Sequence, residues 1–155
     1  MSERKKPSEQ KPVMSKLSKQ DQELVDAASD AITKRYRYDW QEVGAALRTR
    51  SGKVFTGVSL DAYLGRMAIC AEAVALGQAI TNAGETGIEM IVAVRHPPPE
   101  EKDRAIAVVS PCGACRELIW DYDRDARVIV PGSNGPESVG IGELIPNKYS
   151  RERGS

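Results

Sequence analysis

The three cysteines of the chain form two groups whose spacing suits a single metal ion. Cys70 opens the run Cys-Ala-Glu, and Cys112 and Cys115 stand three residues apart directly after Pro111. Residues three apart on a helix share one face, so both sulfurs can reach the same small ion. Cys70 completes a set of three thiolates if the start of its own helix is brought alongside.

Three thiolates predict a zinc ion with one open coordination position. Thiolate is a preferred ligand of Zn²⁺, and three protein ligands leave the fourth position free, which is the catalytic arrangement. Both cysteine groups are expected at helix N-termini, where unpaired N–H groups and the helix dipole favour the thiolate form. A closed structural zinc site and inert buried thiols are the alternatives. The third cysteine and the proline before Cys112 favour the catalytic site.

Glu72 is the candidate for proton transfer beside that site. It follows Cys70 by two residues, so its side chain points in another direction and need not bind the metal. A carboxylate that can take a proton from water is valuable there, because three thiolates weaken the effect of zinc on that water. The alternative is an ordinary acidic residue in the first turn of a helix. Arg116 is predicted to hydrogen-bond the thiolates and offset their charge, with a plain surface charge as the alternative.

The pattern of apolar residues predicts alternating helices and strands. Spacings of three and four predict helices at 18–36, 70–83, 112–122 and, in short form, 142–145, with Ser18 as a cap for the first. Apolar runs and turn residues predict a hairpin over 43–60, strands at 88–94, 106–109 and 127–130, a loop at 96–104 and a turn at 131–137. This order is typical of an α/β layered domain.

Length and composition predict one domain with two tails. The 155 residues divide into a disordered tail at 1–18, a domain at 19–150 and a short tail at 151–155. Zero net charge and 5% aromatic residues argue against a nucleic-acid partner. No apolar run is long enough for a membrane helix, and three cysteines without a secretion signal predict a cytoplasmic protein without disulfides.

At its cysteine groups the sequence resembles the cytidine deaminase family, in its small homotetrameric branch with three cysteine ligands. The segments VGAALRTRSGKVFTGVSL, CAE, VSPCGACREL and GELIP resemble family segments in the right order, from Leu24 to Tyr149. The resemblance implies an α/β/α fold with a five-stranded mixed sheet. It also implies zinc-dependent hydrolytic loss of ammonia from C4 of cytosine, with Glu72 moving protons to N3 and the leaving amine.

The resemblance leaves the substrate open, because two stretches depart from ordinary cytidine deaminases. Ser59 and Asp61 stand where the family usually has an Asn-x-Glu pair that grips the ribose, and Ala73 stands where Arg usually follows CAE. Blasticidin S deaminases are similar to this chain in having an apolar residue directly after CAE. Their C-terminal ending also resembles LIPNKY, which contains Tyr149. Trp40 is interpreted either as the pocket wall beside the base or as core.

The site implied by the resemblance also includes Ala71 and Ser110 as substrate contacts, and Tyr149 as a contact made to a neighbouring subunit of the homotetramer. The predicted substrate is a cytosine nucleoside, either cytidine or deoxycytidine or one like blasticidin S. The alternatives are deamination of another aminopyrimidine or amidine-like heterocycle, and a zinc-stabilised binding module without turnover. Glu72 argues against the last, since a structural site has no use for a carboxylate beside an open ligand position.

Overall fold

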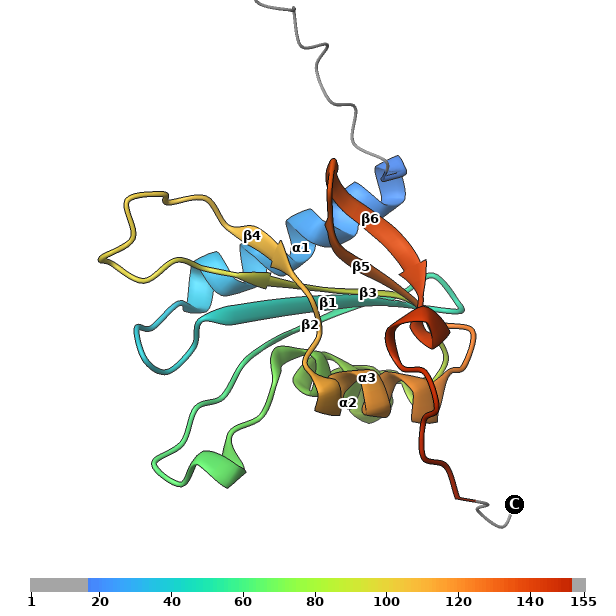
Figure 1. Ribbon diagram of the computed structural model, residues 1–155. Helices are drawn as coiled ribbons and strands as arrows, with labels where there is room; N and C mark the ends of the chain where they lie inside the picture. The colour runs from blue at the N-terminus through green and yellow to red at the C-terminus, as the bar shows by residue number, and fades with distance from the viewer. Residues whose placement is uncertain (1–16, 152–155) are drawn as a thin grey trace, which may run out of the picture.

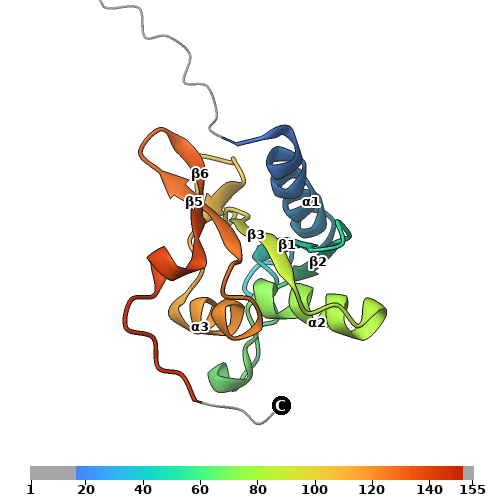
Figure 2. The ribbon, with the colours of Figure 1, turned by 90° about the vertical axis from the view of Figure 1, so that its right-hand side faces the viewer.

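The computed structural model describes residues 17–151 and has three layers. Helix α1 covers one face of a mixed sheet, and helices α2 and α3 lie together on the other face (Figures 1 and 2). In chain order the elements are α1 (Lys19–Arg35), β1 (Val43–Thr49), β2 (Val54–Val58), the 3₁₀ turn η1 (Gly65–Met67), α2 (Ala71–Ala83), β3 (Ile88–Arg95), β4 (Ala107–Val109), α3 (Gly113–Tyr122), β5 (Arg127–Gly132), β6 (Gly135–Gly140) and the 3₁₀ turn η2 (Ile141–Leu144). The predicted α/β/α class is confirmed.

Five strands of the sheet follow one path, in the order β2-β1-β3-β5-β6. Strands β3 and β5 are parallel and the other pairs are antiparallel, so the sheet is mixed. The sixth strand, β4, is short and pairs with the end of β3, where Ala93 faces Val109. On the edge of β3 away from β1, residues 90–92 pair with β5 and residues 93–95 pair with β4. This pairing matters for the site because it brings the segment after β4 close to the start of α2.

Two apolar clusters fill the spaces between the layers. Strand β3 contributes to both, because its alternate side chains point to opposite faces of the sheet. Ile91 and Ala93 pack on the side of α2, whereas Met90, Val92 and Val94 pack on the side of α1. A continuous apolar run such as this one is typical of a strand covered on both faces.

Small side chains let α2 lie close to the sheet. Ala71, Ala75 and Ala79 are fully buried. A Cβ atom added at Gly57 of β2 would lie 2.5 Å from the main-chain nitrogen of Ala75, closer than real contacts allow. The start of α2, which carries Cys70, is therefore held tightly against the hairpin of β1 and β2.

Each of the helices α1, α2 and α3 begins directly after a residue singled out in the sequence. Ser18 caps α1, and its Oγ accepts a hydrogen bond from the Asp21 N–H at 3.1 Å. Cys70 is the residue before the first turn of α2, and Cys112 has the same place in α3. The predicted starts of these helices are confirmed to within a residue.

The predicted turn at 131–137 is wrong, because most of it belongs to two strands. Strands β5 and β6 form a tight hairpin in which Gly132 pairs with Gly135. The sequence of β6, GPESVG, has one large apolar residue and two glycines, so it carries no strand pattern of its own. The strand forms because the end of β5 offers main-chain groups to pair with. The turn η1 was likewise not predicted.

The predicted tail at 1–18 lies outside the described residues except for 17 and 18, and of the tail at 151–155 only residue 151 is described. Within the described part of the chain, every helix is too short or too polar to cross a membrane.

Candidate metal centre and its pocket

The starts of α2 and α3 bring the three cysteines together. Their Sγ atoms all lie within 4.8 Å of one another, and those of Cys70 and Cys112 are 3.6 Å apart. A tetrahedral zinc ion with Zn–S bonds of about 2.3 Å holds its sulfur ligands roughly 3.8 Å apart. All three thiols are free, and Cys115 is buried while Cys112 is exposed. The spacing and the soft sulfur donors therefore fit Zn²⁺ with one position open.

The thiols differ in acidity because their surroundings differ. Burial is the main reason why the pKa of Cys115 is raised, and it also raises the pKa of Cys70. Burial acts in the same direction on Cys112, yet hydrogen bonds, first among them the one from the Cys115 N–H at 3.4 Å, lower its pKa below the ordinary value. Zinc ligands must be deprotonated, so metal binding to this cluster releases protons.

Glu72 lies in the first turn of α2 and is 5% exposed. Its carboxylate is not part of the cluster of possible metal ligands, which among residues 17–151 contains the three sulfurs. Removal from water raises its pKa above the usual value for a glutamate. A buried carboxyl beside an open metal site, with a raised pKa, is better suited than an exposed glutamate to accepting and returning a proton.

A cavity of about 370 Å³ opens over the cysteines, within the range of roughly 300–1,000 Å³ that is common for small-molecule sites. Five predicted substrate contacts, Trp40, Ser59, Asp61, Ala71 and Ser110, line it together with Cys70, Cys112 and Glu72. Asp39, Glu42, Val43, Leu60, Ala68, Ile69 and Val109 complete the lining. The structure thus brings most of the predicted site residues into one pocket.

The mouth of the pocket is formed by two segments, residues 39–42 and 59–61, which are joined by hydrogen bonds. The Asp61 N–H donates to the carbonyl of Trp40 at 3.1 Å. The Ser59 Oγ accepts from the main-chain N–H groups of Glu42 at 3.3 Å and Val43 at 3.2 Å. The hydroxyl of Ser59 therefore holds the mouth together and keeps its own O–H to donate.

Trp40 is half-buried at the wall of the pocket rather than in the core. Its ring meets the edge of Tyr63, with 5.2 Å between ring centroids, and the guanidinium carbon of Arg37 lies 5.2 Å from its centroid. These contacts fix the indole from two sides. Of the two interpretations that the sequence left open, the pocket wall is the one that matches this position.

Arg116 and Tyr149 lie elsewhere than the predicted contacts suggest. The hydrogen bonds of Arg116 in the described chain go to two main-chain carbonyls, those of Pro111 at 2.9 Å and Leu144 at 3.1 Å, so it joins the start of α3 to η2. Tyr149 is 77% exposed and lines a different hollow, together with residues of α3 such as Glu117 and Asp121. Within one chain it does not line the pocket over the cysteines.

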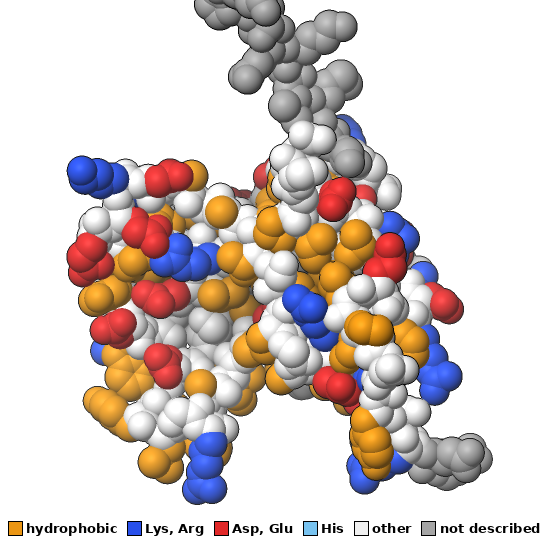
Figure 3. Space-filling model, viewed as in Figure 1, with side chains coloured by type: hydrophobic (Ala, Val, Ile, Leu, Met, Phe, Trp, Pro, Cys, Tyr) orange, Lys and Arg blue, Asp and Glu red, His pale blue; other side chains and the backbone are white. Residues whose placement is uncertain are grey.

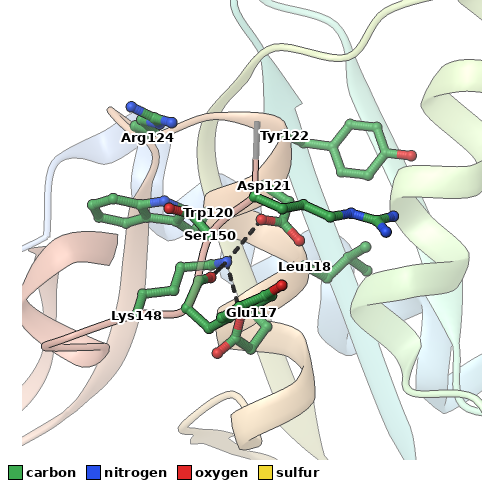
Figure 4. Close-up of a pocket in the computed structure, with 10 residues that line it drawn as sticks. Glu117, Leu118, Trp120, Asp121, Tyr122, Arg124, Lys148 and Ser150 are labelled. Carbon is green, nitrogen blue, oxygen red and sulfur yellow. Dashed lines mark hydrogen bonds and ion pairs between the residues drawn. The ribbon is translucent and has the colours of Figure 1, made fainter. Parts of the chain in front are cut away.

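The C-terminal segment is held on α3 by a lysine that sequence reasoning missed. The ammonium group of Lys148 lies 2.8 Å from a carboxylate oxygen of Glu117 and 2.8 Å from one of Asp121 (Figure 4). Its side chain is only 5% exposed. A lone lysine in a polar terminal segment carries no signal of this contact, whereas Glu117 and Asp121, four residues apart, mark one face of a helix.

Comparison with known proteins identifies the family. The model of the cytidine and deoxycytidylate deaminase zinc-binding region matches residues 18–131. The chain belongs to this family. It is 48% identical over 135 residues to a blasticidin-S deaminase of Bacillus cereus, covering 87% of this chain and 96% of that one. It is 30% identical over 132 residues to a probable cytidine deaminase of Dictyostelium discoideum, with 84% of each chain covered.

Solved cytidine deaminases share the fold. That of Burkholderia pseudomallei superposes with a TM-score of 0.67 at 26% identity, over 83% of this chain and 98% of that one. That of Bacillus anthracis gives a TM-score of 0.69 at 21% identity, over 83% and 89%. The family, the fold class, the enzyme class of zinc-dependent hydrolytic deaminases and the fit of the site to zinc are therefore confirmed.

Proposed function

We propose that this protein deaminates a cytosine nucleoside by hydrolysis, releasing ammonia from C4 of the base. The substrate is cytidine or deoxycytidine, or a cytosine nucleoside like blasticidin S, in keeping with the 48% identical relative. The observation that carries the proposal is the buried carboxylate of Glu72 in one pocket with Cys70 and Cys112, whose sulfurs cluster with that of Cys115. A site that served only to stabilise the fold would gain nothing from that carboxylate, because burying it costs free energy.

In this proposal Cys70, Cys112 and Cys115 hold the zinc ion. A bound zinc ion supplies its usual hydrolytic chemistry, a nucleophile derived from water at neutral pH. Glu72 takes the proton of that water, delivers it to N3 of the ring and then moves a proton to the leaving amine. One residue can serve these steps because burial raises the pKa of the Glu72 carboxyl, which makes it a better proton acceptor than an ordinary glutamate.

The walls of the pocket orient the nucleoside. The base lies deep, near Ala71 and Glu72, with Trp40 as an apolar wall beside it. Ser59 has an O–H free to donate, and the exposed Asp61 carboxylate can accept from a sugar hydroxyl. Ser110 lies next to the ligand segment of α3 and can bond the polar edge of the base. These roles follow from position and donor chemistry.

The proposal includes a homotetramer and a cytoplasmic location. The segment between β2 and α2 carries large exposed apolar side chains next to the pocket, among them Tyr63, 94% exposed, with Leu64 and Met67. Covering them with a second copy of the chain would bury apolar surface and close the pocket wall. Tyr149, held in place by Lys148, would then reach a neighbour's site. A reducing compartment keeps the three cysteines as thiols.

The test is a panel of cytosine nucleosides and amino-heterocycles incubated with purified, zinc-loaded protein, with ammonia release as the readout. Turnover of cytidine, deoxycytidine or blasticidin S, lost in Glu72→Gln, supports the proposal. Turnover confined to other aminopyrimidines or amidine-like heterocycles would replace the substrate class. A protein that binds one zinc ion but releases no ammonia from any of them would be a zinc-stabilised binding module.

A further inference from the structure

The chain has one histidine, His96, which directly follows β3. Its ring stacks on that of Tyr36, the residue that ends α1, with 3.7 Å between ring centroids and an interplanar angle of 19°. The ends of α1 and β3 that carry the two rings lie side by side at the left of Figure 1. Both side chains are half-buried, and neither lines the pocket over the cysteines. The proposed function therefore gives this contact no role.

Tyr36 contacts His96 through its ring and not through its hydroxyl. The hydroxyl oxygen of Tyr36 is buried and has no hydrogen-bond partner among residues 17–151. The Nδ1 of His96 donates to the carbonyl oxygen of Pro97 at 2.9 Å, since a carbonyl can only accept, and this bond holds the imidazole in its stacked orientation. Flat rings in close contact attract each other beyond the apolar area that they bury. The stack is therefore a packing contact that another flat ring at either position can make.

His96 holds both ends of the turn between α1 and β1. Its ring packs on Tyr36, where the turn begins, and its main-chain N–H donates at 2.8 Å to the carbonyl of Glu42, where the turn ends. This main-chain bond extends the pairing of β1 with β3 by one residue, because Val43 pairs with Arg95. A single residue after β3 thus fixes both the entry and the exit of the turn.

The turn between these two ends is rigid in itself. Arg37 and Gln41 exchange both main-chain hydrogen bonds, at 3.0 and 2.8 Å, and the Trp40 N–H donates to the carbonyl of Arg37 at 2.9 Å. Asp39 takes the left-handed conformation with a φ of 60°, which aspartate tolerates better than most residues. Because a rigid turn moves as one body, the contacts at its ends decide where its side chains lie. Among those side chains is Trp40, which forms a wall of the pocket.

The remaining contacts of the turn come from the other neighbour of β1 or from exposed charges. The Asp61 N–H, in the segment after β2, donates to the carbonyl of Trp40 at 3.1 Å. Charged side chains of both signs gather at the left of Figure 3, over the segments before β1 and after β3. Exposed ion pairs contribute little, because water and salt screen them. The stacked rings are thus the contact best placed to keep the turn against the end of β3.

We infer that His96, through its stack on Tyr36, is a positioning residue for Trp40, so that it controls how well the pocket wall fits the base and not the transfer of protons. The inference rests on the proposed function for what Trp40 touches, a cytosine base. A base beside a less well-fixed indole binds more weakly. The first turns of α2 and α3, which carry the chemistry, keep their geometry, because the stack lies outside both helices.

The first test follows the position of Trp40 directly, in full-length, zinc-loaded protein labelled with 5-fluorotryptophan. The chain has two tryptophans, so the ¹⁹F NMR spectrum holds two resonances, which Trp40→Phe assigns. Trp120 lies on α3 outside the pocket and is the internal control. His96→Ala should shift or broaden the Trp40 resonance and leave the Trp120 resonance unchanged.

The second test is kinetic, with ammonia release from cytidine as the readout. In His96→Ala the KM should rise about three- to tenfold, the range expected of an aromatic pair, whereas kcat should change by less than about twofold. Tyr36→Leu keeps apolar bulk without a flat ring and should have the same effect, so the inference can be tested even where His96→Ala does not fold. The two changes together should add little to either alone, because each removes the same contact.

Conservative variants and a matched control assign the effect to the ring contact. His96→Phe and Tyr36→Phe each keep two flat rings, so both should retain the KM and the Trp40 resonance of the wild-type protein. Tyr122→Ala removes a tyrosine ring of the same size from the end of α3, where it is 44% exposed and outside the pocket. This control should leave both readouts unaltered.

The outcomes separate this inference from the proposed function. A Trp40 resonance and a KM that His96→Ala and Tyr36→Leu leave unchanged would overturn the inference while deamination stands, as would a His96→Phe variant as impaired as His96→Ala. Changes in both tryptophan resonances would assign the stack to general stability and overturn it as well. A response of the Trp40 resonance alone, with no ammonia released from any cytosine nucleoside, would support the positioning of Trp40 and overturn the proposed function.

Discussion

The floor of the pocket is made from the first turns of two packed helices, whereas its mouth is made from two connecting segments, residues 39–42 and 59–61. The floor holds cysteine sulfurs and a buried carboxylate, with positions fixed by helix geometry and the sheet beneath. The mouth is held by a few main-chain hydrogen bonds and exposes its charges to water. This contrast assigns chemistry to the floor and choice of substrate to the mouth, and both halves of that assignment can be tested.

The largest effect is expected from a substitution that removes one of the three cysteine sulfurs. Cys115→Ser removes a buried ligand, so the protein should lose its zinc and all turnover. The Tm should fall by at least about 10 °C, because metal binding is also folding free energy and 1 kcal/mol corresponds to roughly 2–4 °C at this size. Zinc per chain and a thermal melt measure both. Ala114→Ser, one residue away and exposed, is the control. Wild-type protein that is metal-free yet folded and active would contradict the prediction.

The second effect keeps the floor intact and removes its proton carrier. Glu72→Gln should lower kcat by about 10²–10⁴-fold, the usual contribution of a general acid–base group. Zinc content should not change, because the carboxylate lies outside the sulfur cluster. The Tm should stay level or rise, since the amide relieves the cost of burying a charge. Near-normal turnover in this variant would refute the role and return the site to a structural one.

The third effect concerns the proposed contact of Tyr149 with the pocket of a neighbouring subunit. Removing residues 149–155 leaves Lys148 and its ion pairs on α3 but takes away Tyr149. If Tyr149 reaches a neighbouring site, KM should rise by roughly tenfold, about 1.4 kcal/mol, with little change in Tm. Removing only 151–155 is the matched control and should have no effect.

That prediction combines two claims, the assembly into a tetramer and the contact of Tyr149 with a neighbouring pocket. Light scattering on the same samples tests the two claims separately. A tetramer whose KM is unaffected by the truncation would refute the role of Tyr149 alone. A fully active monomer would refute both the assembly and the shared site.

The smallest effect concerns the sugar. Asp61 is shorter than the glutamate that it replaces in the family pattern, so the ribose 3′-hydroxyl should contribute less here than in a reference cytidine deaminase. The 3′-deoxy analogue should lose less than about fivefold in kcat/KM, since a net hydrogen bond is worth about 1 kcal/mol. Asp61→Glu should restore a steeper loss. A 3′-deoxy penalty in the wild-type protein as large as in the reference enzyme would show that the shorter side chain still reaches the sugar.

Local sequence was enough to predict most elements and the floor. Residues three apart lie on the same face of a helix, so the spacing of Cys112 and Cys115 predicts that their sulfurs lie close together. Both cysteine groups stand at helix starts, as predicted. The hairpin of β1 and β2 and the buried strand β3 also follow from local patterns. These features are short in range, because each depends on residues within one or two turns or on one pair of adjacent strands.

The mouth was not predicted as a unit, because its residues come from two segments that are separated in the sequence by the hairpin of β1 and β2. Glu42 and Asp39 carry no motif, and the place of Glu42 in the pocket depends on Ser59, which follows the neighbouring strand β2 and whose Oγ accepts from the N–H groups of Glu42 and Val43. Strand β6 has a weak pattern and forms because β5 presents a partner. The mouth becomes visible only when residues from the segments on either side of the hairpin of β1 and β2 line one cavity.

The amino-acid sequence by itself was enough to predict the candidate ligands, the candidate proton carrier and the α/β order of this protein. These depend on residue type and on spacings that a helix or strand converts directly into geometry. The tertiary structure alone decided that Cys70 meets Cys112, that Trp40 faces the pocket, and that Tyr149 does not reach it within one chain. Packing of α2 and α3 on a common face of the sheet sets those relations, and no local pattern encodes the distance between two elements that the chain joins only through the sheet.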